Sequence, residues 1–338
     1  MTEQPTRVSD GVAAVSAKAA QLRRLELEVT IRLDGMLRGD FAGLRPGPGS
    51  ETAGTRTYDV GDDARRIDWS LTARSLTPQV RTTEADRELH TWLVVDRSPS
   101  MDFGTALCEK RDVAFSAAAA YGFLTARHGN RFGILVAGGD RVSRIGPSTT
   151  RPALFASLSK LYDVTRSETK SEGAPASAVN ICRALLELER TRPRRGQIVV
   201  ISDFLDDHDW VAPMRRLAFH HQVVAVQTVD PRELMLPAMG IAAFVDPETG
   251  RRLHVQTNAA ALRSRYEVAA RERQESIAQA IRTAGAEHLV LRTDRDWLID
   301  IVKFVAGRKS MRGKSRADQA RNVRHPKLTA VAAAPRGV

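Results

Sequence analysis

The sequence predicts a doubly wound, Rossmann-type α/β fold with a mostly parallel sheet. Short continuous apolar runs, such as Thr91–Val95 and Gln197–Ser202, alternate along the chain with longer amphipathic or Ala-rich segments. Continuous apolar runs are typical of strands that are buried on both faces, and a helix between two such strands makes the parallel crossover. The 338 residues and the hydrophobic content of 42% allow a sizeable core, which excludes a fibrous or wholly disordered chain.

The first 88 residues precede this alternation. Residues 1–18 are polar and without pattern, so we expect a disordered leader there. Within residues 19–88, leucines and isoleucines at helical spacing predict a helix over 22–37. A Gly/Arg/Asp-rich stretch follows, with short extended pieces at Thr55–Tyr58 and Gln79–Thr83. We therefore expect an N-terminal helix and an irregular, partly β segment that packs against the α/β domain.

The α/β domain is expected over residues 89–306. Its strands are predicted at Thr91–Val95, Arg131–Ala137, Gln197–Ser202, Gln222–Val229 and His288–Leu291, with a further edge strand at Val142–Ile145. Its helices are predicted at Ala106–Arg127, Arg151–Tyr162, Val179–Arg192, Trp210–His220, Ala259–Ala284 and Arg295–Gly307. Ile241–Val245 and Arg251–Val255 flank the turn signal Pro247–Gly250, which predicts a β-hairpin.

Most of the net charge of +11 lies at the C-terminal end. Residues 308–338 hold nine Lys or Arg and a single acid, Asp318, and the rest of the chain carries only +3. A basic segment without aromatic residues cannot bury enough surface to offset its ordering entropy, so we expect residues 307–338 to be disordered. Binding of nucleic acid or another polyanion through this tail is one alternative function, although no specific nucleic-acid partner is expected.

Apolar stretches, the N-terminal residues and the cysteines indicate where in the cell the protein is found. No stretch approaches the roughly 20 apolar residues of a membrane-spanning helix. Residues 1–16 lack the basic start and apolar run of a secretory signal. The two cysteines, Cys108 and Cys182, stand alone, without the spacing of a disulfide framework or a zinc site. We expect a cytoplasmic protein without a transmembrane segment.

Oxygen-bearing side chains follow two of the predicted strands. Asp96, Ser98 and Ser100 come directly after the first strand, and Asp203 comes directly after the strand that ends at Ser202. In a parallel sheet both strand ends lie at the carboxyl edge, where ligands bind. One interpretation is that the two acids only cap the following helices. The other is a magnesium site, because Mg²⁺ prefers oxygen ligands and takes only one or two carboxylates.

The same residues and the stretch before them resemble a known family. The motifs are Gly39-Asp40-Phe41, Gly47-Pro48-Gly49, Gly61-Asp62-Asp63-Ala64-Arg65-Arg66-Ile67-Asp68-Trp69, Ala73-Arg74, Asp96-Arg97-Ser98-Pro99-Ser100, Ile201-Ser202-Asp203 and Asp246-Pro247-Glu248-Thr249-Gly250. Together they resemble the family named domain of unknown function 58. Its members contain a von Willebrand factor A-like domain and accompany bacterial MoxR-type AAA+ ATPases. This chain is similar to the short, soluble form, without the two transmembrane helices of some relatives.

The resemblance implies a protein-interaction function. It implies a metal-ion-dependent adhesion site (MIDAS) with Mg²⁺ or Mn²⁺ on Asp96, Ser98, Ser100 and Asp203 and an open position for a partner's carboxylate. The partner would be a MoxR-type AAA+ ATPase, and the pair would mature a client protein in a chaperone-like way. Such sites usually add a Thr, but Val179 stands at that position. Two alternatives follow: either Ser177, two residues earlier, substitutes for the Thr, or the metal site is weak or vestigial.

A metal-dependent phosphohydrolase with an aspartyl nucleophile is the enzymatic alternative. Asp96 also has the position of such a nucleophile, at the end of a first strand, and acids after the strand that ends at Ser202 could supply a cation site. These enzymes need an acid two residues after the nucleophile to protonate the leaving group, and here that residue is Ser98. We therefore expect a protein that is not an enzyme.

Overall fold

The computed structural model describes most of the region between residues 20 and 307. The described residues are 20, 22–32, 52–59, 62–83, 90–126, 129–138, 141–166, 180–206, 210–245, 251–305 and 307. The expected leader 1–18, the basic tail after residue 307, the turn 246–250 and Ser177 all lie outside them.

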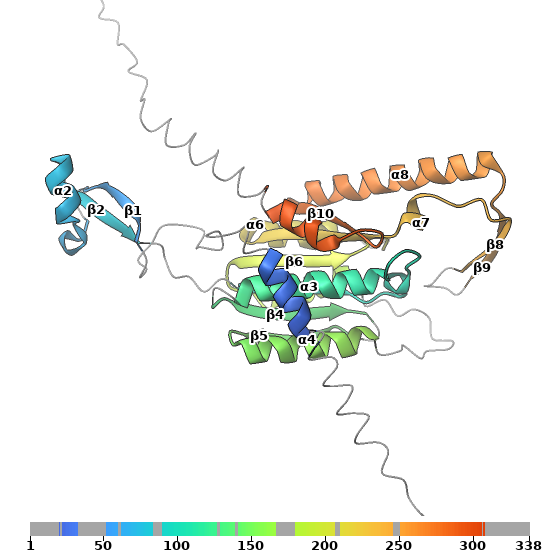
Figure 1. Ribbon diagram of the computed structural model, residues 1–338, viewed down its shortest axis with the longest axis horizontal. Coiled ribbons are helices and arrows are strands. Elements are labelled where there is room, and N and C mark those ends of the chain that lie inside the picture. Colours follow the sequence, from blue (N-terminus) through green and yellow to red (C-terminus); the bar gives the residue numbers. More distant parts are fainter. Residues whose placement is uncertain are drawn as a thin grey trace, which may run out of the picture.

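A six-stranded sheet forms the centre of the molecule (Figure 1). The strands of the chain are β1 (Thr52–Thr57), β2 (Gln79–Thr83), β3 (His90–Asp96), β4 (Arg131–Ala137), β5 (Ser143–Ser148), β6 (Gly196–Ser202), β7 (Gln222–Val229), β8 (Ile241–Val245), β9 (Arg252–Gln256) and β10 (Glu287–Arg292). In the large sheet their order is β10-β7-β6-β3-β4-β5, and every neighbouring pair is parallel except β4 with β5. The predicted doubly wound, mostly parallel fold class is confirmed.

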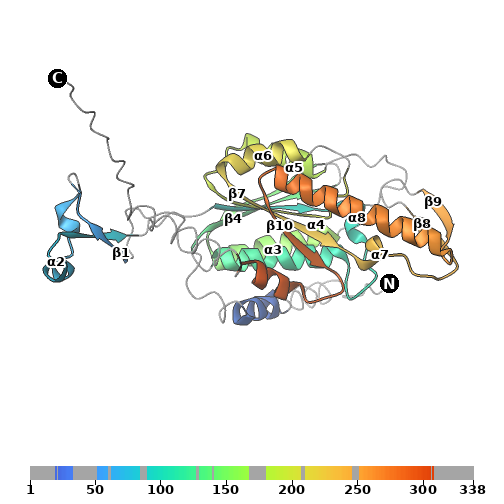
Figure 2. The same cartoon turned by 90° about the horizontal axis from the view of Figure 1, so that it is seen from above.

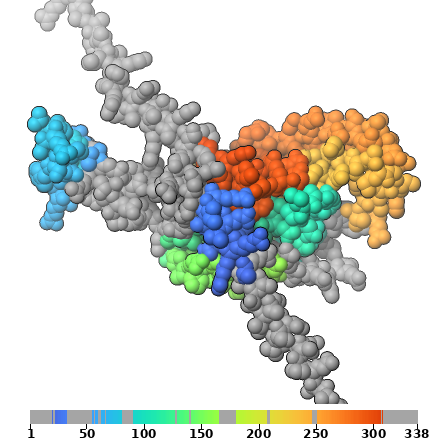
Figure 3. Space-filling view, in the orientation of Figure 1, coloured from blue at the N-terminus to red at the C-terminus, as the bar shows by residue number. Residues whose placement is uncertain are grey.

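Helices cover both faces of this sheet, as the view from above shows (Figure 2). The helices are η1 (Ala64–Arg66), α2 (Trp69–Ser75), η2 (Pro99–Asp102), α3 (Lys110–Ala126), α4 (Arg151–Arg166), α5 (Ile181–Arg190), α6 (Val211–His220), α7 (Pro231–Leu234) and α8 (Ala260–Thr283). Two further helices span residues 22–32 and 297–305. One face packs against α3, α4 and these two terminal helices, and the other packs against α5, α6 and α8. The N-terminal helix lies on the surface, beside the C-terminal helix (Figure 3).

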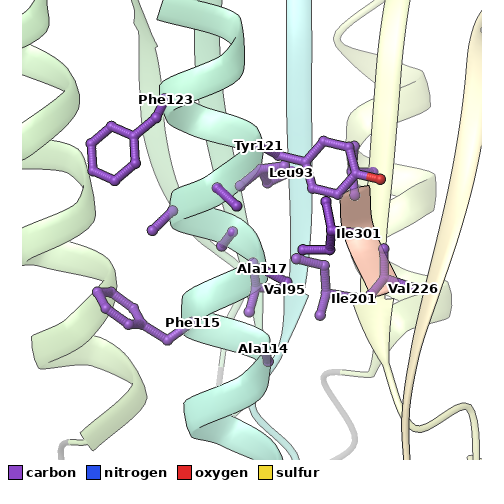
Figure 4. Packing of buried hydrophobic residues seen from close by; sticks show 14 of the residues in the cluster. Leu93, Val95, Ala114, Phe115, Ala117, Tyr121, Phe123, Ile201, Val226 and Ile301 are labelled. Carbon is purple, nitrogen blue, oxygen red and sulfur yellow. The ribbon is translucent and has the colours of Figure 1, made fainter. Parts of the chain in front are cut away.

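Side-chain alternation along the central strands explains why two cores form. Leu93 and Val95 of β3 belong to the core under α3, whereas Trp92 and Val94 belong to the opposite core. All four are at most 4% exposed, so the strand reads as continuously apolar in the sequence. The buried alanines of α3 let this helix approach the sheet closely, with its larger rings at either side (Figure 4).

A small unit formed by β1, η1, α2 and β2 precedes the large sheet. The strands β1 and β2 are antiparallel, and Asp63 and Asp68 cap η1 and α2 by accepting hydrogen bonds from Arg65 N and Leu71 N. The sequence predicted extended pieces here but not α2. Both views draw this unit apart from the six-stranded sheet, and the docking expected of it stays a prediction (Figures 1 and 2). Trp69, the first residue of α2, is 69% exposed.

Some helix boundaries differ from the predicted ones. The helix expected from Ala106 begins at Lys110, because Thr105 in the preceding loop donates two hydrogen bonds to Asp230 instead of entering a helix. The helix expected from Val179 is described from Ile181, after the cap Asn180. Within the described residues, no helix combines the length and the apolar character needed to cross a bilayer.

The close packing of β3 on β4 leads to a stability prediction. Gly133 lies opposite Trp92 in the sheet, and a Cβ atom at Gly133 would lie 2.6 Å from the indole ring. Gly133→Ala is therefore expected to lower the free energy of unfolding by about 1–3 kcal/mol, measured by urea denaturation. Gly146→Ala in β5 is the matched control, because no atom lies within 4 Å of the position its Cβ would take. Equal stability of the two variants would contradict the described register.

Candidate functional site

The carboxyl ends of β3 and β6 bring the predicted acids to the same place. The two strands are neighbours in parallel register, with Val95 opposite Ile201. Asp96 is the last residue of β3, and Asp203 directly follows β6. Their side chains are 5% and 3% exposed. Two carboxyl groups are thus buried together at the edge of the sheet where loops converge.

Asp96 is held by hydrogen bonds to both of its oxygens. Ser202 Oγ donates to Asp96 Oδ2 at 2.6 Å, and the backbone N–H of Ser98 donates to Asp96 Oδ1 at 2.8 Å. Burial raises the pKa of the Asp96 carboxyl to about 7, and the nearby Asp203 carboxylate contributes in the same direction. The surroundings of Asp96 therefore disfavour its ionised form, and a cation bound beside it would stabilise that form.

The two predicted serines lie side by side next to Asp96. The hydroxyl oxygens of Ser98 and Ser100 are 3.0 Å apart, and both residues are half-buried. Ser98 is the N-cap residue of η2, yet its side chain makes no capping hydrogen bond. Asp96 and Asp203 accept from backbone N–H groups only two residues ahead, Ser98 and Leu205, and so do not cap the following helices. Neither acid therefore caps the helix that follows it, although Ser98 stands at the N-cap position of η2.

A buried lysine completes the charge arrangement. Lys110 is fully buried, its Nζ lies 2.8 Å from Asp203 Oδ2, and it also pairs with Glu233. Burial alone would lower the pKa of Lys110, but the two carboxylates outweigh it and raise the pKa above its ordinary value. Lys110 lies in the first turn of α3, where the helix dipole disfavours a cation. The ion pairs with Asp203 and Glu233 compensate for both unfavourable effects.

A third buried acid, Asp230, connects the surrounding loops. Asp230, at the end of β7, is fully buried and accepts hydrogen bonds from Thr105, Thr293 and the backbone N–H of Arg232. Although burial favours the neutral form, these hydrogen bonds lower the pKa of Asp230 overall. Its own N–H donates to Glu233, which forms a capping box at α7. The loop before α3 and the start of α7 are therefore fixed around the site.

This arrangement fits a small, oxygen-preferring dication. The Asp96 carboxyl group lies close enough to Asp203 to feel its charge and next to Ser98, whose hydroxyl contacts that of Ser100, so the functional groups at this end of the sheet are carboxyls and hydroxyls. No group of three or more His, Cys, Asp or Glu side chains in the described part of the chain could by itself hold a metal ion. A cation here would thus depend on the hydroxyls and on water, which is how Mg²⁺ is usually bound. Ser177 lies outside the described residues.

Three residues of the site were not among those predicted from the sequence. They are Ser202, Lys110 and Glu233. Ser202 stands beside Asp203 in the recognised motif, so its position was a usable signal. Lys110 and Glu233 are 123 positions apart in the chain, and only the folded structure brings them together.

The buried ion pairs give a testable consequence. Lys110→Met leaves the carboxylates of Asp203 and Glu233 buried without their cation, and we expect a loss of about 3–5 kcal/mol of unfolding free energy in urea denaturation at neutral pH. Lys160→Met, at an exposed position of α4, should change it by less than about 0.5 kcal/mol.

A variant that lacks all three charges of this cluster separates the effect of charge on stability from the effect of packing. The triple variant Lys110→Met, Asp203→Asn, Glu233→Gln removes all three charges and should recover most of the lost stability. A Lys110→Met variant as stable as the original protein would show that Lys110 does not balance the two acids.

Sequence comparisons identify close relatives of this chain. Uncharacterized proteins of Mycobacterium tuberculosis (strain H37Rv) and Mycobacterium bovis are 46% identical over 293 residues, which is 86% of this chain and 90% of the relative. An uncharacterized protein of Mycobacterium avium is 41% identical over 130 residues, covering 38% of this chain and 76% of the relative.

Solved structures resemble the fold more distantly. The conserved hypothetical protein BatB of Bacteroides thetaiotaomicron is 16% identical, with a TM-score of 0.43, and covers 67% of this chain and 99% of its own. An aerotolerance-related membrane protein of Bacteroides fragilis is 17% identical, with a TM-score of 0.42, and covers 64% and 95%. A von Willebrand factor type A protein of Catenulispora acidiphila is 14% identical, with a TM-score of 0.31, and covers 44% and 34%.

The family model described as "Protein of unknown function DUF58" matches residues 54–276. The match runs from β1 through the candidate site into α8. It agrees with the resemblance carried by the Gly/Arg/Asp-rich motifs and by the two strand ends. The chain therefore belongs to the DUF58 family.

Proposed function

We propose that this protein is a non-enzymatic protein-interaction module whose binding site is the acidic end of β3 and β6. Asp96, Ser98 and Ser100 would hold Mg²⁺ or Mn²⁺ directly, and Asp203 would act directly or through a water molecule. Ser177 is a further candidate ligand. The cation would supply an open coordination position for a carboxylate of the partner, as in adhesion sites of the von Willebrand A type.

One observation carries this proposal. Asp96 is a buried carboxyl group whose pKa is raised to about 7 by burial and by Asp203, and two hydroxyl oxygens lie beside it without capping a helix. A turn with only a structural role would not require two buried carboxyl groups so close together. A bound dication would stabilise the ionised form of Asp96 and engage the two hydroxyls.

The geometry supports binding over catalysis. A hydrolase that used Asp96 as its nucleophile would need an acid at residue 98, where the Ser98 hydroxyl instead contacts Ser100. Lys110 is fully buried in ion pairs with Asp203 and Glu233, so it does not face a substrate as a general acid. The DUF58 family description assigns no reaction.

We further propose that the partner is a MoxR-type AAA+ ATPase. The family resemblance supports this choice, since members of this family accompany such ATPases. In that arrangement the ATPase supplies energy, and this chain links it to a client protein whose maturation has a chaperone-like character. The domain over residues 89–306 would carry the contact.

Metal binding should be visible in thermal unfolding. With Mg²⁺ or Mn²⁺ at about a hundred times its Kd, a ligand bound only by the native state adds ~2.7 kcal/mol, so the Tm of the protein should rise with cation concentration. Asp96→Asn should abolish that rise. In EDTA the same variant should have a higher Tm than the original protein, because it removes a buried charge.

Asp163→Asn, at an exposed position of α4, is the matched control and should keep the metal-dependent rise. A Tm that is unchanged by either cation at millimolar concentration would contradict the metal site. So would an equal rise in Asp96→Asn.

Partner binding should depend on the same site. In a pull-down with a purified MoxR-type ATPase from the same genome, we expect the original protein and Asp163→Asn to be retained in Mg²⁺ and released by EDTA. Asp96→Asn should not be retained, although it folds. Retention of Asp96→Asn in EDTA would remove the metal from the mechanism, and no retention of the original protein would remove this partner.

A further inference from the structure

The amino edge of the sheet, opposite the candidate metal site, carries a concentration of arginines. Here α5 and α6 end side by side and the chain turns into β6 and β7 (Figure 2). The exposed cationic residues of this surface, which we call the arginine edge, are Arg190, Arg192, Arg194, Arg195, Arg215, Arg216 and His220, with Arg282 at the end of α8. The net charge of +3 outside the tail gave no sign of such a surface.

Specific contacts hold these elements together. Arg216 donates two hydrogen bonds, of 2.7 and 3.0 Å, to the carboxylate of Glu189, and these bonds join α6 to α5. Arg195 Nε donates to the carbonyl oxygen of His220 at 3.1 Å, which joins the turn before β6 to the end of α6. These contacts fix the ends of α5 and α6 and the turn before β6 next to one another.

Four of its guanidinium groups have no acidic partner in the part of the chain that the structure describes. Within the described residues, Arg190, Arg192, Arg194 and Arg215 make no side-chain hydrogen bond or ion pair. Of the acids here, Glu189 pairs with Arg216, Glu287 accepts a hydrogen bond from Gln222, and Glu187 lies in the last turn of α5. The helix dipole stabilises cations in the last turn of a helix. It does not account for Arg192 and Arg194, because they lie beyond the end of α5.

The cations of the arginine edge also affect the pKa values of two nearby histidines. Burial lowers the pKa of His221, and His220 and Arg195 lower it further. Burial likewise lowers the pKa of His288, with Arg282 as the second cause. In both cases the contribution of the neighbouring cations, which is smaller than that of burial, has the sign expected when cations gather without enough anions to balance them.

We propose that the arginine edge binds an acidic segment of a partner protein. Guanidinium groups form paired hydrogen bonds with carboxylates, and Arg216 already holds a carboxylate in this way on the same surface. Phe219, 80% exposed and next to His220, adds an apolar contact of the kind that is frequent in protein interfaces. A single-stranded nucleic acid would instead use several stacking rings along a groove.

This site is separate from the proposed metal site. The arginine edge lies at the amino ends of the parallel strands, whereas Asp96 and Asp203 lie at their carboxyl ends. The protein could therefore hold two different proteins at opposite ends of one rigid sheet. The inference does not depend on whether a cation binds at Asp96.

Fluorescence anisotropy with the full-length protein tests the proposal. The probe is a fluorescein-labelled ten-residue peptide of eight glutamates and two leucines, in low salt. The variant Arg190→Gln, Arg194→Gln, Arg215→Gln should weaken binding by about tenfold, because it removes three exposed cations. The control Arg252→Gln, Arg265→Gln, Arg271→Gln makes the same charge change at exposed positions of β9 and α8 and should change the Kd less than about twofold.

Hydrogen exchange then locates the contact. The peptide should protect the amides of residues 190–195 and 215–221. Equal Kd values for the two triple variants would overturn the proposal, since the basic tail present in both would then account for binding. Tighter binding of a ten-residue oligothymidine with protection of the same amides would also overturn it, in favour of a nucleic-acid surface.

Discussion

The ion pair between Lys110 and Asp203 is the interaction on which the carboxyl edge of the sheet depends. Asp203 and Asp96 are both buried, and two carboxylates so placed repel each other unless a cation compensates. Lys110 satisfies Asp203 and Glu233, but it leaves Asp96 with a raised pKa. The protein thus builds one counter-charge into its fold, and the cation that we propose beside Ser98 and Ser100 would supply a second.

The fold and the main site residues could be predicted because both are local properties of strands. Continuous apolar runs such as that of β3 mark strands buried on two faces, and the residue after each run must lie at the carboxyl edge. Asp96 and Asp203 were found this way. Lys110 was not, because nothing in an amphipathic or Ala-rich helix distinguishes a lysine that turns into the core from one that faces water. Its burial depends on Asp203 and Glu233, both far away in sequence.

The same reasoning explains the other differences from prediction. The start of α3 was placed four residues early because Thr105 is held by Asp230, an acid 125 positions later in the chain. The arginine edge was hidden because its charges come from the ends of three helices and one turn, while the summed charge of the chain before the tail is small. In both cases, residues that lie together in the fold are far apart in the sequence. Local pattern specifies which elements form, and tertiary contacts decide which charged groups meet.

The central claim is that the ends of β3 and β6 form a cation site completed by hydroxyl groups. Crystals of the protein soaked in Mn²⁺ test it most directly, through an anomalous difference map recorded near the manganese edge. We expect one strong peak in contact with the Asp96 carboxylate and the hydroxyls of Ser98 and Ser100, and no such peak in crystals of Asp96→Asn. A map without a peak at this edge of the sheet, or with a peak that persists in Asp96→Asn, would contradict it.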